Sequence, residues 1–440
     1  MTDLLDNIKA TKNVFWQNTL QKSAVEAAKL TRFTKVDIDD AEARLDRFAP
    51  YLVEVFPETK KTNGIIESEL TAIPKIKEQL EEVYHTEIQG ELYLKRDDSL
   101  PIAGTIKARG AIYEVLKHAE TLVLANGLLK STEEDYTIFA SDEFKAFFAK
   151  HRIMVGTTGN LGISVGVMGA RLGFDVTVHM SVEAKQWKKD MLRTHGVNVI
   201  EHNTNFTEAV ENGRAQAEAD PMCYFVDDEH SAELFLGYTV AGNRMKRQLE
   251  DMAIKVDEDH PLFVYLPCGI GGSPGGITFG LKQHFGDNVH CFFAEPAHMP
   301  SMLLGLATGK FDGVTVQEYG IEPKTVMDGL AVPRTSGLVA KLMQHYFDGG
   351  YTLQEEEAMY WLAKMVDTAD IHLEPAALAG LPGAAFLTSN KDGQAYLADK
   401  GLTDKMAQAT HIAWATGGSM VPQEDKVAFY LQGLQANITE

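Results

Sequence analysis

The stretch Leu262-Phe-Val-Tyr-Leu-Pro-Cys-Gly-Ile-Gly-Gly-Ser-Pro-Gly-Gly276 is the strongest indicator of the fold class. Its apolar first half is typical of a buried β-strand, and its last eight residues include five glycines. Glycines after a strand let the backbone approach a ligand, and a following helix N-terminus attracts anions. We expect a phosphate-binding turn formed by Gly269, Ile270, Gly271, Gly272 and Ser273; a tight turn without a ligand is the alternative.

Short apolar segments of this kind recur along the chain, with helix-length patterns between them. The expected strands are residues 91–95, 152–155, 175–180, 198–200, 262–266, 290–294 and 411–414. Strands that alternate with helices indicate an α/β protein with parallel sheets. In such sheets, ligands bind where the strands end and the helices begin.

Composition limits the classes of partner. The 440 residues carry a formal net charge of −21, which repels nucleic acid and acidic membrane surfaces. The uncharged run 262–281 has the length of a membrane span, but its six glycines and two prolines argue against a lipid-exposed helix. Three widely spaced cysteines fit a reducing compartment, and the N-terminus shows no apolar signal segment. We therefore expect a cytoplasmic protein without nucleic-acid or membrane partners.

One lysine stands out in the segment Pro101-Ile-Ala-Gly-Thr-Ile-Lys-Ala-Arg-Gly110. Lys107 lies in a mostly apolar run and opens a pattern of apolar residues at helical spacing. A lysine in partly dry surroundings loses its proton more easily, and its free amine can form a Schiff base. A helix lysine that reaches into solvent is the alternative.

Two further loops follow expected strands. Thr157, Thr158, Gly159 and Asn160 offer hydroxyls and an amide that suit a carboxylate and a phenolic oxygen; capping of the next helix is the alternative. Thr416 begins the run Thr416-Gly-Gly-Ser419, where its hydroxyl could face a ring nitrogen.

Three matches to other motifs are weak. Gly271-Gly-Ser-Pro-Gly275 fits the nucleophile-elbow pattern, but Pro274 lacks the N–H group that an oxyanion hole requires. The second match, Gly162-Ile-Ser-Val-Gly166, lies well beyond its strand, where small residues allow close helix packing. The run 305–310 is one residue too short for a P-loop. These observations disfavour a serine hydrolase and a P-loop nucleotidase.

Taken in order, the motifs resemble those of the fold-type-II pyridoxal-phosphate enzymes, and among them the D-serine dehydratase family. The matching segments are 101–110, 158–162, 269–273 and 414–418, with further matches at 292–296, 328–332 and 373–380. The resemblance thus extends over most of the chain. The departures are mild: Thr105 and Thr157 are hydroxyl substitutions, and Ser273 replaces a glycine.

The resemblance implies a role for each motif. Lys107 would bind pyridoxal 5'-phosphate covalently, and Lys107 and Thr158 are the candidate catalytic residues. Asn160 would contact the phenolic oxygen of the cofactor, and residues 157–160 would bind the substrate carboxylate. The turn 269–273 would hold the phosphate, and Thr416 would face the pyridine nitrogen. Glu295 is the candidate ligand of a monovalent cation, K⁺ or Na⁺.

The implied reaction is β-elimination of D-serine to pyruvate and ammonia, with D-threonine as a second candidate substrate that would give 2-oxobutanoate. A threonine at the ring nitrogen favours elimination over transamination, because it cannot protonate the ring as a carboxylic acid could. Residue types do not encode handedness, so an L-serine/L-threonine dehydratase, a serine racemase or a β-replacing synthase stays open. So does a phosphate-binding α/β protein without enzymatic activity.

The resemblance also implies two domains, each with a largely parallel sheet flanked by helices. The larger, cofactor-binding domain would comprise residues 1–129 and 241–440, and residues 130–240 would form a smaller inserted domain that carries Asn160. By the same resemblance we expect a monomer with a small amino acid as its substrate.

Overall fold

The computed structural model describes residues 2–157, 159–203 and 206–438. The chain divides into two compact units that alternate along the sequence. The first consists of Met1–Lys35, Ser68–Ser99 and Ala241–Glu440, and the second of Val36–Glu67 and Leu100–Val240. Each unit has its own β-sheet with helices around it, which confirms the predicted α/β fold class. The domain boundaries expected from the sequence stay a prediction.

The larger sheet belongs to the first unit and has seven strands in the order β1-β10-β9-β8-β11-β3-β2. Their bounds are Phe15–Gln17 (β1), Leu70–Ala72 (β2), Glu91–Arg96 (β3), Leu262–Pro267 (β8), Val289–Pro296 (β9), Gly349–Leu353 (β10) and Thr410–Ala415 (β11). The five central strands are parallel, and the edge strands β1 and β2 pair antiparallel. Strands β8 and β9 are buried along their whole length, as expected for a parallel sheet covered on both faces.

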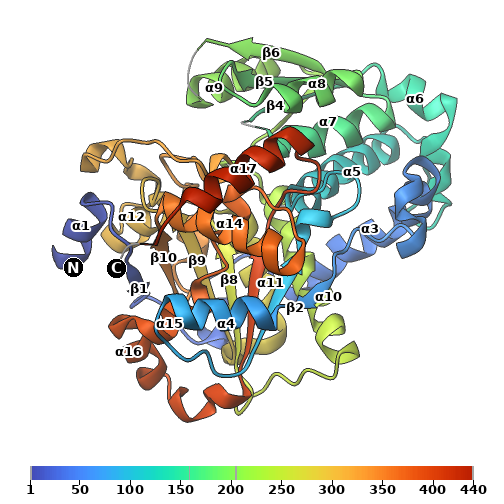
Figure 1. Ribbon diagram of the computed structural model, residues 1–440. Helices are drawn as coiled ribbons and strands as arrows, with labels where there is room; N and C mark the ends of the chain where they lie inside the picture. Colours follow the sequence, from blue (N-terminus) through green and yellow to red (C-terminus); the bar gives the residue numbers. More distant parts are fainter. Residues whose placement is uncertain (1, 158, 204–205, 439–440) are drawn as a thin grey trace. The chain divides into compact units, whose positions relative to one another are not determined.

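Helices of the first unit pack around this sheet. They are Thr2–Lys9 (α1), Ala24–Ala28 (α2), Pro74–Val83 (α4), Gly272–Phe285 (α11), Ser301–Thr308 (α12), Gly337–Met343 (α13), Glu355–Ala369 (α14), Gly383–Ser389 (α15), Lys391–Asp399 (α16) and Gln423–Gln435 (α17). In the view of Figure 1, α4, α14, α15 and α17 lie in front of the strands. Between α14 and the sheet the core includes Trp361, Tyr265 and Phe292.

The second unit holds a parallel four-stranded sheet in the order β6-β5-β4-β7. Its strands are Arg152–Gly156 (β4), Asp175–Ser181 (β5), Asn198–His202 (β6) and Cys223–Val226 (β7). The helices of this part of the chain are Lys35–Val55 (α3), Lys107–Ala125 (α5), Asp142–Phe148 (α6), Asn160–Leu172 (α7), Gln186–Thr194 (α8) and Phe206–Glu218 (α9). Helix α10 (Ala232–Asp251) begins here and continues into the first unit.

Short 3₁₀ helices complete the described elements. They are Pro57–Thr62, Asp97–Ser99, Tyr136–Ala140, Gly286–Asn288, Phe311–Gly313, Gln317–Tyr319, Asp328–Leu330, Pro375–Leu378 and Thr403–Gln408.

Two of the weak motif matches, 162–166 and 305–310, overlap helices. Ser164 is inside α7 and donates to the carbonyl oxygen of Asn160 (3.1 Å), so the pattern 162–166 is not a nucleophile elbow. Residues 305–308 of the run 305–310 form the end of α12, which Gly309 terminates in a left-handed conformation (φ +68°).

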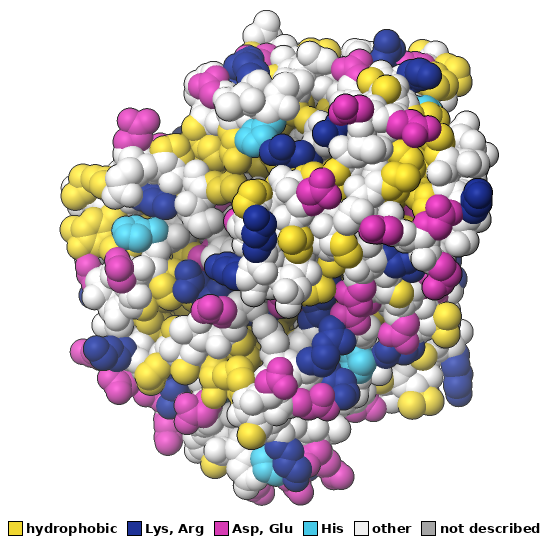
Figure 2. Space-filling model, turned by 90° about the vertical axis from the view of Figure 1, so that its right-hand side faces the viewer, with side chains coloured by type: hydrophobic (Ala, Val, Ile, Leu, Met, Phe, Trp, Pro, Cys, Tyr) yellow, Lys and Arg dark blue, Asp and Glu magenta, His cyan; other side chains and the backbone are white. Residues whose placement is uncertain are grey.

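Charged side chains are spread over the surface. On the face shown in Figure 2, acidic side chains are interspersed with Lys and Arg side chains. Within the described residues, no helix combines the length and the apolar character that crossing a membrane requires.

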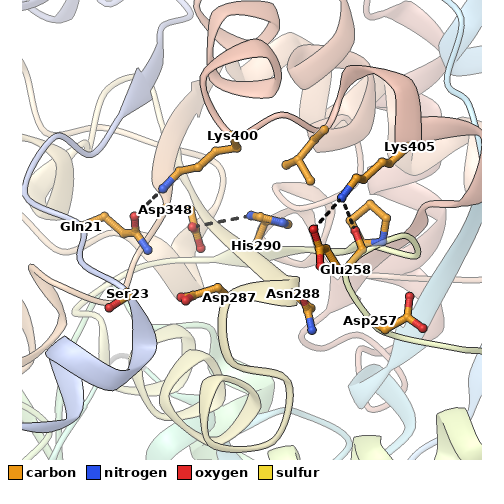
Figure 3. A pocket seen from close by; sticks show the side chains of 12 residues that line it. Gln21, Ser23, Asp257, Glu258, Asp287, Asn288, His290, Asp348, Lys400 and Lys405 are labelled. Carbon is orange, nitrogen blue, oxygen red and sulfur yellow. Dashed lines mark hydrogen bonds and ion pairs between the residues drawn. The ribbon is translucent and has the colours of Figure 1, made fainter.

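The first unit contains a cavity of about 320 Å³ where β8, β9 and β10 begin (Figure 3). Asp348 and His290 form part of its wall. Behind the wall, the Asp348 carboxylate pairs with the buried Lys282 ammonium at 2.9 Å. This cavity lies at the amino ends of the strands, whereas the glycine-rich turn and Thr416 follow the carboxyl ends of β8 and β11.

Candidate active site

The glycine-rich turn follows β8 at the carboxyl edge of the larger sheet. Gly271 is the N-cap of α11 and adopts φ +111°, a conformation that favours glycine. A Cβ atom at Gly271 would also overlap the Met302 methyl group. The carbonyl oxygen of Ile270 accepts hydrogen bonds from the Ser336 N–H (3.0 Å) and the Thr335 hydroxyl (3.1 Å), which fix the turn.

This turn has the features of an anion site. Ile270 and Ser273 are buried, and no side chain of the described residues caps the first turn of α11. A Cβ atom at Gly269 would come within 3.2 Å of the Gly329 carbonyl oxygen, so the backbone segments run close together. A buried helix N-terminus whose N–H groups lack a side-chain cap suits a phosphate group.

Thr416 follows β11, the strand that pairs with β8. Both strands therefore end at the same edge, and Thr416 lies next to the glycine-rich turn in the order of the sheet. Its side chain is buried. Glu374 packs beside this segment, because its N–H donates to the Gly417 carbonyl oxygen (3.1 Å) and a Cβ atom at Gly417 would overlap its carboxylate.

Glu295 lies in β9, the other neighbour of β8, and is fully buried. Its carboxylate oxygens accept the N–H groups of Met302 (2.7 Å) and Leu303 (2.9 Å) in the first turn of α12. Burial raises the pKa of Glu295 to about 8, and these hydrogen bonds oppose the shift. These hydrogen bonds attach the first turn of α12 to β9.

Lys107 is in the second unit and is the first residue of α5, as expected from the sequence. Its amine lies 3.9 Å from the Asp228 carboxylate, and its side chain is 18% exposed. The amine also lies 5.9 Å from the centre of the Tyr238 ring. The lysine is thus shielded on one side by an aromatic ring and faces an anion.

A buried polar atom beside Lys107, the Oδ1 atom of Asp228, lacks a hydrogen-bond partner among the described residues. The Tyr238 hydroxyl is also buried there, next to the Lys107 amine. Burial raises the pKa of Tyr238 to about 12, so its hydroxyl stays protonated at neutral pH. Unpaired buried groups of this kind are expected where a bound ligand completes the hydrogen bonding.

A close helix crossing places Tyr238 beside Lys107. A Cβ atom at Gly110 of α5 would come within 2.6 Å of the Tyr238 ring, and one at Gly237 of α10 within 2.8 Å of the Arg109 carbonyl oxygen. The two glycines therefore let α5 and α10 approach backbone to backbone. Arg109 itself pairs with Glu67 (2.5 Å), which fixes the first turn of α5.

The loop with Asn160 follows β4 in the second unit. Strand β7 pairs parallel with β4 and ends just before Asp228, so this loop and Asp228 lie at the same edge of the smaller sheet. Asn160 begins α7, which packs against α5. The Thr157 hydroxyl accepts the Gly159 N–H (3.0 Å), so it orders the loop. Thr158 lies outside the described residues.

Asp228, Tyr238, Lys188 and Glu374 are candidate site residues to which the sequence analysis assigned no role. The ammonium-bearing side chain of Lys188 is buried against Gly159, where a Cβ atom would overlap it. If Cys223–Val226 had been predicted as a strand, Asp228 would have been expected at the carboxyl edge of a sheet. The strand was not predicted because it is only four residues long. Lys188 and Tyr238 follow no motif, and only the packing of the helices reveals them.

The chain belongs to the pyridoxal-phosphate-dependent enzymes, because the model of the family described as "Pyridoxal-phosphate dependent enzyme" matches residues 72–396. A protein from Bacillus mycoides named "Probable D-serine dehydratase" is 55% identical over 98% of this chain and 96% of its own length. A Geobacillus stearothermophilus protein of the same name is 54% identical over 98% of this chain and 94% of its own length. The predicted resemblance is therefore confirmed.

Solved structures agree on the fold. Diaminopropionate ammonia lyase from Escherichia coli, in complex with D-serine, has a TM-score of 0.71 at 16% identity, covering 97% of this chain and 98% of that one. Serine racemase from Dictyostelium discoideum has a TM-score of 0.60 at 16% identity, covering 89% of this chain and all of the other. Both likenesses support the fold-type-II assignment.

The residues present fit the family's cofactor. The α11 N-terminus suits its phosphate, and the buried Oδ1 atom of Asp228 can accept a hydrogen bond from a group bound beside Lys107. Each feature lies within a single unit of the chain.

Proposed function

We propose that this protein catalyses the pyridoxal-phosphate-dependent β-elimination of D-serine to pyruvate and ammonia, and of D-threonine to 2-oxobutanoate and ammonia. The observation that carries the proposal is the identity of 54–55%, over nearly the whole chain, with proteins named for D-serine dehydration. These names favour D-serine over the alternatives of an L-serine dehydratase and a serine racemase.

Lys107 would hold the cofactor covalently, Asn160 would donate to its phenolic oxygen, and Thr416 would face its ring nitrogen. The backbone from Gly269 to Ser273 would bind its phosphate. When bound, pyridoxal phosphate supplies an electron sink that acidifies the Cα–H bond of the substrate amine.

Protein groups then have three tasks. Residues 157–160 would orient the substrate carboxylate, and the buried Lys188 would add positive charge beside them. The Lys107 amine would exchange with the substrate amine and is the first candidate to take the Cα proton. Its partner Asp228, 3.9 Å away, would orient this amine. A loop hydroxyl, Thr158 or Thr157, would protonate the departing hydroxyl group.

Thr416 sets the reaction class in this scheme. A threonine hydroxyl cannot protonate the ring nitrogen as a carboxylic acid could, so a long-lived carbanion is disfavoured. Loss of the β-hydroxyl group as charge develops is then preferred over transamination.

We also propose that Glu295 binds K⁺ or Na⁺. Its buried carboxylate accepts the N–H groups of Met302 and Leu303, and oxygen ligands suit such cations. Added KCl should raise activity, and Glu295→Gln should remove that response. A KCl response that survives in Glu295→Gln would contradict the assignment.

We further propose that the protein is a monomer and that it is located in the cytoplasm. Among the described residues no disulfide joins Cys223, Cys268 or Cys291, which is consistent with a reducing compartment. Light scattering of the purified protein would test the monomer, because a dimer would have twice the chain mass of 48.5 kDa.

The test is a panel of D- and L-hydroxy amino acids with the purified holoenzyme. We expect pyruvate from D-serine and 2-oxobutanoate from D-threonine, with little product from the L-isomers. Preferential turnover of L-serine, or interconversion of the two isomers without pyruvate, would assign one of the alternatives instead.

A further inference from the structure

We propose that Glu114 is a positioning residue for the reactive lysine: it fixes the turn 227–231 so that Asp228 faces the Lys107 amine. This inference rests on the proposed function, because it assigns Lys107 as the reactive amine. Glu114 lies two helical turns beyond Lys107 on α5 and is almost fully buried.

Both oxygens of Glu114 are engaged by hydroxyl groups. The Tyr224 hydroxyl donates to Oε1 and the Ser231 hydroxyl to Oε2, each at 2.8 Å. Tyr224 belongs to β7, the strand before Asp228, and Ser231 is the last residue of the turn. Glu114 therefore ties the segments on both sides of Asp228 to the helix that Lys107 begins.

The attachment extends to the start of α10. The Ser231 hydroxyl also accepts the Leu234 N–H (3.0 Å), and the Ser231 N–H donates to the Asp227 carbonyl oxygen (2.9 Å). On the outer side, Arg214 pairs with Asp227 (2.9 Å) and Glu229 (3.1 Å). The residues flanking Asp228 are thus bound elsewhere, which leaves the Asp228 side chain to face Lys107.

Burial of a carboxyl group costs its hydration, so a hydroxyl or an amide would make a purely structural link at a lower cost in free energy. Among the described residues no basic side chain pairs with Glu114, and burial, with Glu233 and Asp228 nearby, raises its pKa to about 8. Glu120, on the same helix, is the opposite case: its carboxylate pairs with Arg44 (2.6 Å) and Arg47 (2.8 Å). Glu120 is therefore a matched control, a buried glutamate with a structural role away from Asp228.

The experiment measures the chemical reactivity of Lys107 in the apoprotein by competitive acetylation and mass spectrometry. Lys117, on the same helix, is the internal reference. Asp228→Asn removes the anion that stabilises the ammonium form, so Lys107 should be acetylated about threefold faster or more. Glu114→Ala should give the same increase, and Glu114→Gln should restore a rate near that of the unchanged protein, because an amide can still bond both hydroxyls.

The double variant Glu114→Ala with Asp228→Asn decides between positioning and general destabilisation. If Glu114 acts through Asp228, the double variant should react no faster than Asp228→Asn alone. Glu120→Gln should lower stability without changing the Lys107 rate. Ser231→Ala provides a milder variant if Glu114→Ala does not fold.

Additive effects in the double variant, or an unchanged Lys107 rate in both Glu114→Ala and Ser231→Ala, would overturn the inference. So would an Asp228→Asn protein in which the Lys107 rate is unaltered. The acetylation rates do not depend on any substrate. A failure of D-serine turnover would therefore contradict the proposed function and leave this test intact.

Discussion

The Lys107 amine and the Asp228 carboxylate lie 3.9 Å apart although 120 residues separate them in the sequence. Lys107 begins α5, and Asp228 follows the carboxyl end of β7. Helix packing and parallel strand pairing thus place an amine and an anion together at one edge of the smaller sheet.

Replacement of Asp228 by asparagine tests the role of this pair in turnover. The amide keeps the shape of the side chain but loses the charge that orients the lysine, so kcat should fall about 10- to 100-fold, with a smaller change in KM. Steady-state kinetics with D-serine measures both. Asp190, a surface residue of α8, is a control whose replacement by asparagine should leave kcat unchanged. An Asp228→Asn enzyme with normal kcat would exclude this role.

Gly110→Ala tests the helix crossing beside Lys107. The new methyl group would meet the Tyr238 ring at 2.6 Å and the Leu234 carbonyl oxygen at 2.9 Å, and the second of these is backbone that cannot easily move. Overpacking of this kind costs about 1–3 kcal/mol. Urea denaturation should show the loss, while Gly313→Ala, where a Cβ atom meets nothing within 4 Å, should be neutral. Equal midpoints for the two variants would show that the crossing tolerates a side chain.

The buried ion pair behind the cavity of Figure 3 should be essential for stability. Asp348 accepts from Lys282 (2.9 Å), the Cys291 N–H (2.8 Å) and the Tyr396 hydroxyl (3.0 Å), and the Lys282 ammonium holds the pKa of Asp348 well below its usual range despite burial. Asp348→Asn leaves a buried ammonium without its anion, which costs about 3–5 kcal/mol.

The paired variant Lys282→Met with Asp348→Leu removes both charges and should recover much of that loss. Denaturant midpoints compare the two. If the paired variant is less stable than Asp348→Asn, the stabilisation by Asp348 comes mainly from its hydrogen bonds and less from its ion pair with Lys282.

Glu114 should make stability depend on pH. Burial raises its folded-state pKa to about 8, above the ordinary carboxyl value of 4.5. The folded protein therefore retains a proton that the unfolded chain releases. This stabilisation is complete below the ordinary pKa and is lost as pH rises through about 8. Between pH 5 and pH 8 the melting temperature of the unchanged protein should therefore fall relative to that of Glu114→Gln. A constant difference across this range would mean that Glu114 is ionised in the folded state.

The sequence predicted the strands that carry the cofactor motifs, because these strands are long apolar runs followed by glycine-rich turns. All seven expected strands are present, as β3, β4, β5, β6, β8, β9 and β11. Strand β10 was not predicted, since it begins with two glycines, Gly349 and Gly350, which lack the side chains typical of strands. Strand β7 is short, and β1 and β2 are three-residue edge strands.

Within the site, the sequence predicted residues that belong to local motifs: Lys107, Asn160, the turn 269–273 and Thr416. It could not predict Asp228 or Tyr238, whose proximity to Lys107 depends on long-range packing. The glycines at positions 110 and 237 allow that packing, but a glycine in a helix does not reveal its partner.

Borohydride reduction of the purified protein loaded with pyridoxal phosphate, followed by peptide mapping, tests whether Lys107 is the residue that binds the cofactor. We expect a stable pyridoxyl group on the peptide that contains Lys107 and on no other lysine peptide, with loss of the visible absorbance. Lys107→Ala should form no such adduct, whereas Lys117→Ala should. Modification at a different lysine, such as Lys188, or an adduct that survives in Lys107→Ala, would show that Lys107 is not the attachment site.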